Sequence, residues 1–172
     1  GKKYYLDYNH PQSIGMVRQF IGNPNVVLKT YMWIMQHGTE GLKEAAKISV
    51  LNNNYMMKKL KEIRGIVMYY DFGPGKNRLE QVRWSWAKLK EDTGFGTDDV
   101  NQRLSDFGIQ HYWTSHHPWV VPEPFTPEPC ESYSKDDIDE WCGALKAISD
   151  ECYNNPEIIK GAPHSGPVHK VK

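Results

Sequence analysis

The first third of the chain repeats apolar residues with the period of an α-helix. Residues 13–21 place apolar side chains three and four positions apart behind Ser13, whose hydroxyl can cap a short helix. Residues 24–36 repeat this pattern, and Gly38 predicts the end of that second helix. Residues 39–64 predict a third, longer helix, whose last turns gather basic side chains as the helix dipole favours.

The middle of the chain changes to the pattern of strands and turns. β-branched and aromatic residues over 65–71 predict one strand, and the alternation over 79–86 predicts another. The glycines and the proline of residues 72–77 lack the spacing of a phosphate-binding loop. This stretch is therefore interpreted as the connection of a hairpin.

A second mixed region follows. Residues 97–107 predict a helix capped by Thr97, and residues 109–113 predict a short strand. Residues 114–129 are rich in proline and have no helical period, which indicates an irregular segment. An edge strand interrupted by proline is expected at 127–132.

The last region predicts a helix followed by a single turn. Ser134 and Asp137 have the pattern of a capping box, with Asp in the place of the usual Glu. Pro156 predicts one more helical turn. The pattern as a whole predicts an α+β fold, an antiparallel sheet with helices on one face, preceded by long connecting helices. We expect residues 1–64 to form an N-terminal segment with the connecting helices, and residues 65–172 to form the α+β small domain.

Composition and charge exclude several classes of function. Lys+Arg and Asp+Glu both number 21, so the formal charge is zero and no partner of strong charge, such as nucleic acid or an anionic membrane, is favoured. No apolar run reaches the roughly 18 residues of a membrane helix, and no secretory leader is expected. Two of the three cysteines lie about 15 Å apart along one predicted helix, too far for a disulfide. Reduced thiols and a cytoplasmic location, or the mitochondrial matrix in a eukaryote, are therefore expected.

Two features of the sequence allow more than one interpretation. Six Trp, ten Tyr and five Phe are more than a core of this size requires. Some of these aromatic residues could lie at a partner surface, or all of them could fill the core. Residues 52–54 are three consecutive asparagines inside a predicted helix, where asparagine is a poor helix former. One of them could be buried and two solvated, or one could reach a partner or active-site surface.

Histidines and glutamates are the candidates for chemistry in the irregular region. Metal binding would require further ligands at a suitable spacing, and none is evident, so no metal site is predicted. The histidines are either solvated or suited to hydrogen bonding and proton transfer in a cleft: His111, His116 and His117. Three glutamates could supply an acid/base pair or only solvate the loop: Glu123, Glu128 and Glu131.

Several motifs together carry a family resemblance. SIGMVRQFIGN begins at Ser13, AAKISVLNNNYMMKKL at Ala45 and KLKEDTGFGTDDVNQRLSDFG at Lys88. VVPEPFTPEPCESYSKDDIDEW begins at Val120 and NNPEIIKGAPHSGPVHKV at Asn154. The same pieces occur in the same order in glycine decarboxylase, the P-protein of the glycine cleavage system. The chain resembles its C-terminal half, which some organisms make as a separate second subunit.

The resemblance implies a fold, a cofactor and partners. The family has the fold-type I architecture of pyridoxal-phosphate (PLP) enzymes, and this chain would be its small C-terminal domain with the connecting helices. The lysine that binds PLP lies upstream in the family, on the large domain, so no catalytic residue is assigned here and the chain alone is expected to be inactive. A hetero-oligomer with a PLP-bearing large-domain subunit is implied, with a lipoyl carrier protein as a further partner. The implied reaction is the decarboxylation of glycine or of a related amino acid.

Departures from the family pattern bear on the substrate. Family members commonly read GNFGVL where this chain has GNPNVV, and His-Glu-Phe where it has Leu79-Glu80-Gln81. The family implies an edge of the cofactor pocket at the domain junction, to which we assign Ser13, Gly22 and Asn23. It implies a substrate entrance, to which we assign His111, His116 and His117. The departures also keep open an alternative function, a non-catalytic subunit that assembles and stabilises such a complex.

Overall fold

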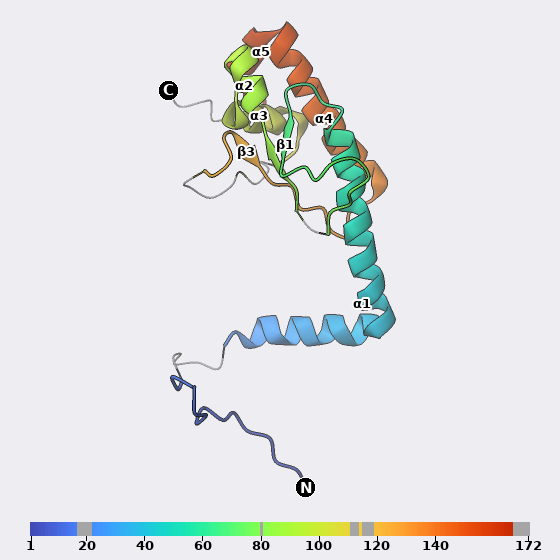
Figure 1. Ribbon diagram of the computed structural model, residues 1–172, viewed down its shortest axis with the longest axis vertical. Helices are drawn as coiled ribbons and strands as arrows, with labels where there is room; N and C mark the ends of the chain where they lie inside the picture. Colours follow the sequence, from blue (N-terminus) through green and yellow to red (C-terminus); the bar gives the residue numbers. More distant parts are fainter. Residues whose placement is uncertain (17–21, 80, 111–113, 115–118, 167–172) are drawn as a thin grey trace. The chain divides into compact units, whose positions relative to one another are not determined.

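The computed structural model describes residues 1–16, 22–79, 81–110, 114 and 119–166. It divides the chain into two compact units, residues 1–43 and residues 44–172, which are described separately below. Figure 1 shows the order of the helices and strands along the chain. The expected domains, 1–64 and 65–172, stay a prediction.

The first unit begins without regular secondary structure. Residues 13–16, where a short helix was expected to begin, are not helical, and residues 17–21 lie outside the described residues. The hydroxyl of Ser13 accepts a hydrogen bond from the Gly15 backbone N–H at 3.0 Å. Ser13 therefore closes a local turn and does not cap a helix.

Helix α1, Pro24–Leu60, starts as the sequence predicts and is interrupted once. The side-chain oxygen of Asn23 accepts hydrogen bonds from the backbone N–H groups of Asn25, at 3.1 Å, and Val26, at 3.4 Å. This is the arrangement of an N-cap, with Pro24 at the first helical position. Gly38 has φ 60° and ψ −174°, a conformation that glycine adopts readily and other residues rarely do. The predicted break is therefore confirmed, but as a kink after which the helix resumes.

The second unit is built around a small antiparallel sheet. Its order is β1 (Val67–Tyr69), β2 (Arg83–Ser85) and β3 (Pro124–Phe125). Met68 faces Trp84 in the first pair, and Trp84 faces Phe125 in the second. The expected hairpin between the first two strands is confirmed.

One expected strand is corrected, and another lies mostly outside the described residues. The edge strand lies at Pro124–Phe125, and residues 127–132 form no strand. Pro124 is the first residue of that strand, a position that tolerates the missing N–H of proline. Residues 109 and 110 are not in a strand, and residues 111–113 lie outside the described residues.

Five further helical elements complete the second unit. Helix α2 is Ala87–Thr93, α3 is Thr97–Leu104, the 3₁₀ turn η1 is Ser105–Phe107, α4 is Lys135–Asn154 and α5 is Pro156–Lys160. The capping box of α4 is confirmed: Ser134 Oγ accepts from the Asp137 N–H at 3.1 Å, and Asp137 Oδ2 accepts from the Ser134 N–H at 2.8 Å. The expected cap of α3 is wrong by one residue, because Gly96 is the N-cap and Thr97 is already helical.

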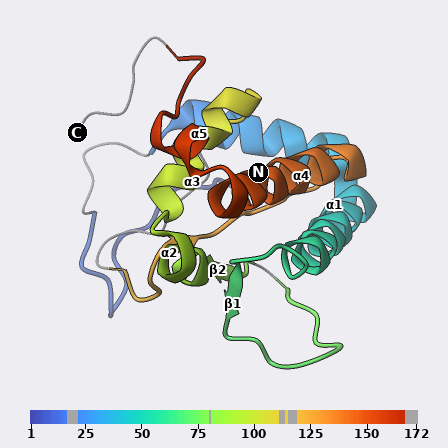
Figure 2. The same cartoon turned by 90° about the horizontal axis from the view of Figure 1, so that it is seen from above.

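One apolar core joins the sheet to the helices. Trp84, Trp86 and Phe125 are fully buried, and the ring centroids of Trp86 and Phe125 lie 5.3 Å apart in a stacked arrangement. Leu145 and Ile148 of α4 belong to the same core. Helices α3, α4 and α5 lie on the same side of the sheet (Figure 2). The α+β fold with an antiparallel sheet is thus confirmed.

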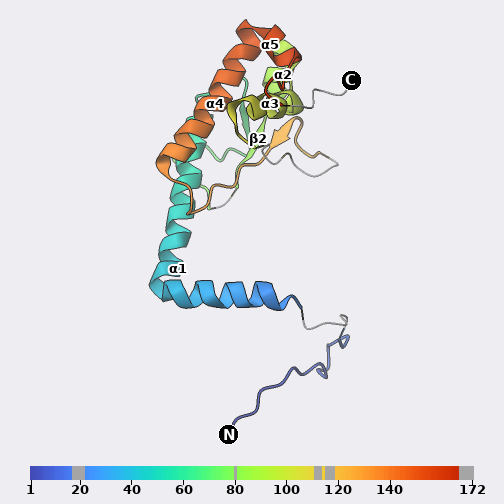
Figure 3. The same ribbon diagram turned by 180° about the vertical axis from the view of Figure 1, so that it is seen from behind.

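Helix α4 runs alongside the part of α1 that belongs to the second unit (Figure 3). The Tyr55 hydroxyl donates a hydrogen bond to Asp139 Oδ1 at 2.6 Å, and the Lys59 ammonium lies 3.0 Å from the same oxygen. Among the described residues, no helix is both long and apolar enough to cross a lipid bilayer.

The three consecutive asparagines are more deeply placed than expected. Asn52 and Asn53 are buried and Asn54 is half-buried, so the expectation of two solvated asparagines is wrong. Asn54 donates to the Arg78 carbonyl and accepts from the Arg78 N–H, at 2.7 and 2.8 Å. A side-chain amide can satisfy both backbone groups of one residue in this way, which explains an asparagine in the middle of a helix.

Candidate functional site

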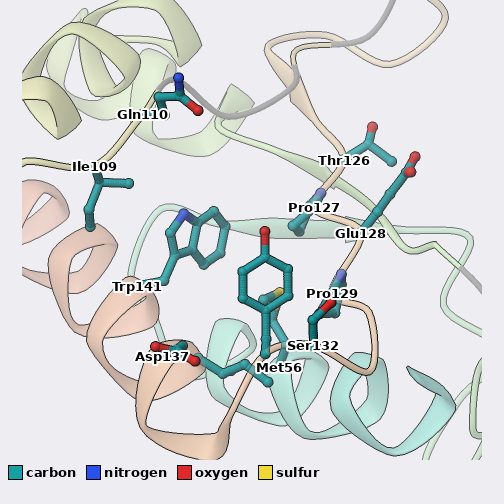
Figure 4. Close-up of a pocket in the computed structure, with 12 residues that line it drawn as sticks. Met56, Ile109, Gln110, Thr126, Pro127, Glu128, Pro129, Ser132, Asp137 and Trp141 are labelled. Atoms are coloured by element: carbon teal, nitrogen blue, oxygen red, sulfur yellow. The ribbon is translucent and has the colours of Figure 1, made fainter. Parts of the chain in front are cut away.

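The second unit contains an open groove with a volume of about 930 Å³. Its residues come from α1, from α4, from the chain after η1 and from the segment between β3 and α4. Figure 4 shows Trp141 projecting from α4 into the groove, with Gln110 on one side and Asp137 on the other. The lining residues are Met56, Ile109, Gln110, Thr126, Pro127, Glu128, Pro129, Ser132, Tyr133, Asp137, Ile138 and Trp141.

The floor of the groove is apolar and the rim is polar. Met56 and Ile138 are buried, and Trp141 is half-buried. Tyr133 is 52% exposed although its phenol ring lines the groove. Aromatic side chains that present an apolar face and a polar edge to solvent are typical of surfaces that bind a partner.

One wall of the groove is held in place by Asn52. Its side-chain N–H groups donate to the carbonyls of Cys130 and Tyr133, at 2.8 and 2.9 Å. Ser49, one turn earlier on α1, donates its hydroxyl to Glu131 Oε2 at 3.1 Å. The segment between β3 and α4 is therefore fixed to α1 at both ends of a short loop, without regular secondary structure of its own.

Two carboxylates give the rim its charge. Glu128 Oε1 accepts a short hydrogen bond from the side-chain amide of Gln81. Asp137 accepts from the Ser134 hydroxyl and from the Ser134 N–H, and these hydrogen bonds lower the pKa of the Asp137 carboxyl. Both side chains are exposed, and the lining residues that the structure describes include no lysine, arginine or histidine. The described part of the groove can thus hold apolar groups and hydrogen-bond donors or cations, and it offers no positive charge to an anion.

The groove does not fit PLP. The cofactor needs a lysine for its aldehyde and donors for its phosphate, and no lysine or arginine occurs among the described lining residues. The two lysines beside α4 near this region, Lys59 and Lys135, are both paired with Asp139. No step of a reaction is therefore derived through PLP in this groove.

The sequence-predicted pocket residues lie in the first unit. The side chains of Ser13 and Asn23 bind local backbone N–H groups, as described above, and Gly22 has φ 133°, a conformation that favours glycine. The predicted substrate entrance lies outside the described residues: His111, His116 and His117.

The three candidate glutamates have separate partners. Glu123 Oε2 accepts from the Thr97 N–H at 2.7 Å, so this carboxylate sits at the start of α3, and its own backbone has φ 46°. Glu128 pairs with Gln81 at the groove, and Glu131 pairs with Ser49. The structure assigns Glu123 to the fold and only Glu128 to the groove.

Sequence reasoning missed the residues that make the groove. Trp141 falls on the apolar face of α4, and periodicity cannot separate a core position from one at the edge of a groove. Tyr133 lies beside the capping box, in a stretch without a pattern that would indicate a binding site. Asn52 was singled out as an unusual helical residue, and that signal did point to its contact with a distant loop.

Cysteine and metal chemistry have no support among the described residues. Burial raises the pKa of the Cys142 and Cys152 thiols to about 12, which makes them poor nucleophiles at neutral pH. All three cysteines are unpaired thiols. Within the described part of the chain, no three His, Cys, Asp or Glu side chains gather as a metal site would require.

Comparison with known proteins gives one consistent result. The family model described as glycine dehydrogenase, C-terminal domain, matches residues 45–164. A crystal structure of glycine decarboxylase (P-protein) of the glycine cleavage system, in inhibitor-bound form, shares the fold with a TM-score of 0.59 and 20% identity. That match covers 76% of this chain and 28% of the crystallised chain.

Relatives with similar sequences carry the same name. Probable glycine dehydrogenase (decarboxylating) subunit 2 of Pyrococcus horikoshii is 44% identical over 98% of this chain. The protein of the same name from Thermococcus onnurineus is 42% identical over 98% of this chain. The chain spans about a third of the length of these relatives, 33% in both cases. From the family match over most of the second unit, we conclude that the chain belongs to the glycine dehydrogenase C-terminal domain family.

Proposed function

We propose that this chain is the C-terminal part of a PLP-dependent glycine decarboxylase and acts together with a partner that carries the PLP lysine. The observation that carries the proposal is the family match over residues 45–164, joined to relatives named as a subunit of a glycine dehydrogenase. The reaction is the decarboxylation of glycine or of a related amino acid, with the transfer of an aminomethyl group to a lipoyl carrier protein. The proposed setting is the cytoplasm.

PLP supplies the electron sink for this chemistry when it is bound, and the partner holds it. This division of labour agrees with a groove whose described lining has carboxylates and no cation, because the phosphate and the aldehyde of PLP both need basic groups. The residues of this chain would shape and close the active site. Alone, the chain is expected to be inactive.

The first unit supports the need for a partner. The helical residues 24–37 leave apolar side chains exposed on several faces, and a helix that is apolar all round is normally buried. The relatives are about three times as long as this chain, so most of the enzyme in them lies outside the matched region. We therefore propose the PLP-bearing partner as the protein that covers these side chains.

The predicted pocket residues remain part of the proposal. Ser13, Gly22 and Asn23 would form an edge of the cofactor pocket, and His111, His116 and His117 would line the substrate entrance. In the assembled enzyme, Asn23→Ala or His117→Ala should lower turnover of glycine. Unchanged turnover in either variant would remove that residue from the site.

A spectrum of the assembled enzyme tests the function. The chain is co-purified with the large subunit from the same source, and the absorbance of bound PLP is recorded before and after glycine is added. A PLP band that shifts with glycine is expected in the complex. A complex that binds PLP but responds to a different amino acid would change the substrate and keep the reaction class.

The second candidate function is a non-catalytic subunit that assembles and stabilises the complex. Two departures from the family favour it, GNPNVV from Gly22 and Leu79-Glu80-Gln81, because both replace common family motifs. A stable complex without a PLP band, or with a band that no amino acid shifts, would support this alternative and contradict the first proposal.

A further inference from the structure

The groove of the second unit has a charge and a shape that restrict what can bind there. We propose that it receives a segment of the PLP-bearing partner in which a lysine stands next to an apolar side chain. This rests on the proposed function, because that partner supplies the segment.

The apolar floor of the groove favours an apolar side chain of the partner. Met56 is 7% exposed and Ile138 is 2% exposed, so they close the bottom of the groove, and the half-buried side chain of Trp141 projects into it. Pro127 and Pro129 border the same space. Tryptophan and methionine are enriched at the centres of protein interfaces, where burial of a single partner side chain contributes most.

The carboxylates of the rim favour a partner group with a positive charge. Glu128 binds Gln81 through Oε1, and Asp137 binds Ser134 through Oδ2. Neither remaining carboxylate oxygen has a hydrogen-bond partner among the described residues. Lys135 and Lys59, the basic side chains that flank this part of α4, are occupied by Asp139 and do not line the groove. A lysine ammonium from the partner could pair with the remaining oxygen of Glu128 or of Asp137, neither of which forms an ion pair with a described residue.

The wall of the groove is already ordered by hydrogen bonds within this chain. Asn52 holds the carbonyls of Cys130 and Tyr133, and Ser49 holds Glu131, so the loop that carries Ser132 and Tyr133 is tied to α1. A binding surface that is already ordered loses little conformational entropy on association. The groove therefore suits a flexible partner segment, which alone would become ordered on binding.

Zero-length cross-linking of the complex tests this inference. A carbodiimide joins carboxylates to lysines that already form ion pairs, and mass spectrometry identifies the joined peptides. We expect Glu128 or Asp137 to be linked to a partner lysine that has an apolar neighbour in sequence. Glu128→Gln should reduce that linkage several-fold, while Glu140→Gln, at an exposed α4 position outside the groove, should leave it unchanged.

Affinity supplies a second measurement with an intact fold. Glu128→Lys reverses the charge of an exposed side chain and should weaken binding of the partner at least tenfold, whereas Glu140→Lys should not. Circular dichroism of both variants verifies that the unit remains folded. An equal effect of the two reversals would contradict the role of the groove.

The outcomes separate this inference from the proposed function. Failure to form any complex, or a complex without PLP, counts against the proposed function and thereby removes the partner on which the inference rests. A PLP-containing complex in which Glu128 and Asp137 are linked to no partner lysine overturns the inference alone. Linkage to a second copy of this chain, or to the lipoyl carrier, also overturns the inference, because the groove would then have a different occupant.

Discussion

The two units of this chain differ in whether their large apolar side chains are exposed or buried. In residues 1–43, Trp33 is 41% exposed and Met35 is 65% exposed, on a helix that has no apolar core of its own. In residues 44–172, Trp84 and Trp86 are 1% and 0% exposed, stacked with Phe125 in a core that joins sheet and helices. Hydrophobic content therefore does not tell which part of a chain is self-sufficient. The distinction lies in whether the chain itself supplies the surface that covers each apolar side chain.

The largest expected effect contrasts the two kinds of tryptophan. Trp86→Ala removes a fully buried ring and should lower the free energy of unfolding of the isolated chain by about 3–5 kcal/mol. Trp33→Ala should change it by less than about 0.5 kcal/mol, because an exposed side chain loses few contacts. Denaturant melts of both variants measure the difference. Equal destabilisation by the two changes would contradict the contrast between the units.

The next effect concerns a buried charge in the second unit. Asp106 accepts hydrogen bonds from the N–H groups of His164 and Ser165, at 2.6 and 2.7 Å, and from Arg103 at 2.9 Å. Burial opposes ionisation of this carboxyl, but the hydrogen bonds from Ser165, Arg103 and His164 outweigh it and lower its pKa to about 2. Asp106→Asn should cost about 1–3 kcal/mol at neutral pH, because donors that served a carboxylate lose their charged partner.

The pH dependence of this effect follows from the lowered pKa. The contribution of Asp106 is complete above the unfolded pKa of about 3.9, and it is lost as the pH falls towards about 2. The stability difference between the natural chain and Asp106→Asn should shrink over this window. Asp98→Asn, at an exposed position on α3, serves as the control and should cost no more than about 0.3–1 kcal/mol.

A smaller effect is expected where α1 holds the groove wall. Asn52→Ala leaves the carbonyls of Cys130 and Tyr133 without their donor and should cost about 1–2 kcal/mol. It should also increase amide hydrogen exchange in residues 130–133. Asn77→Ala, an exposed position in the hairpin connection, is the matched control and should leave both measurements unchanged. Unaltered exchange in the Asn52 variant would show that the loop is held by other contacts.

The smallest effect belongs to exposed charge. Lys146 and Asp150 form an ion pair at 2.9 Å, with side chains 63% and 49% exposed. Lys146→Ala should change stability by less than about 0.5 kcal/mol, because solvent screens such pairs. A thermal melt with and without added salt measures it. A loss above 1 kcal/mol would mean that exposure is a poor guide to energetic weight in this chain.

Much of the fold could be predicted because local signals carry it. The capping box at Ser134, the proline at the start of α1 and the hairpin between β1 and β2 each depend on residues close in sequence. The edge strand was predicted at the wrong residues because it is only two residues long and is defined by its pairing with Trp84. Pairing of that kind depends on tertiary contact, which a local pattern does not contain.

Less of the site could be predicted, for a related reason. The groove brings together Met56, Ile109, Glu128 and Trp141, which come from distant parts of the chain and have ordinary local patterns. Asn52 alone gave a signal, since three asparagines in a helix need an explanation outside it. The assignments of Ser13, Gly22 and Asn23 followed from the family resemblance and stay predictions.

Hydrogen exchange of residues 24–37 tests most directly whether the first unit needs a partner. In the isolated chain these amides should exchange much faster than those of α4, because no apolar core covers the helix. In the complex with the PLP-bearing subunit, their exchange should slow by at least an order of magnitude. Exchange that is already slow in the isolated chain, or that stays the same in the complex, would contradict the dependence of this unit on a partner.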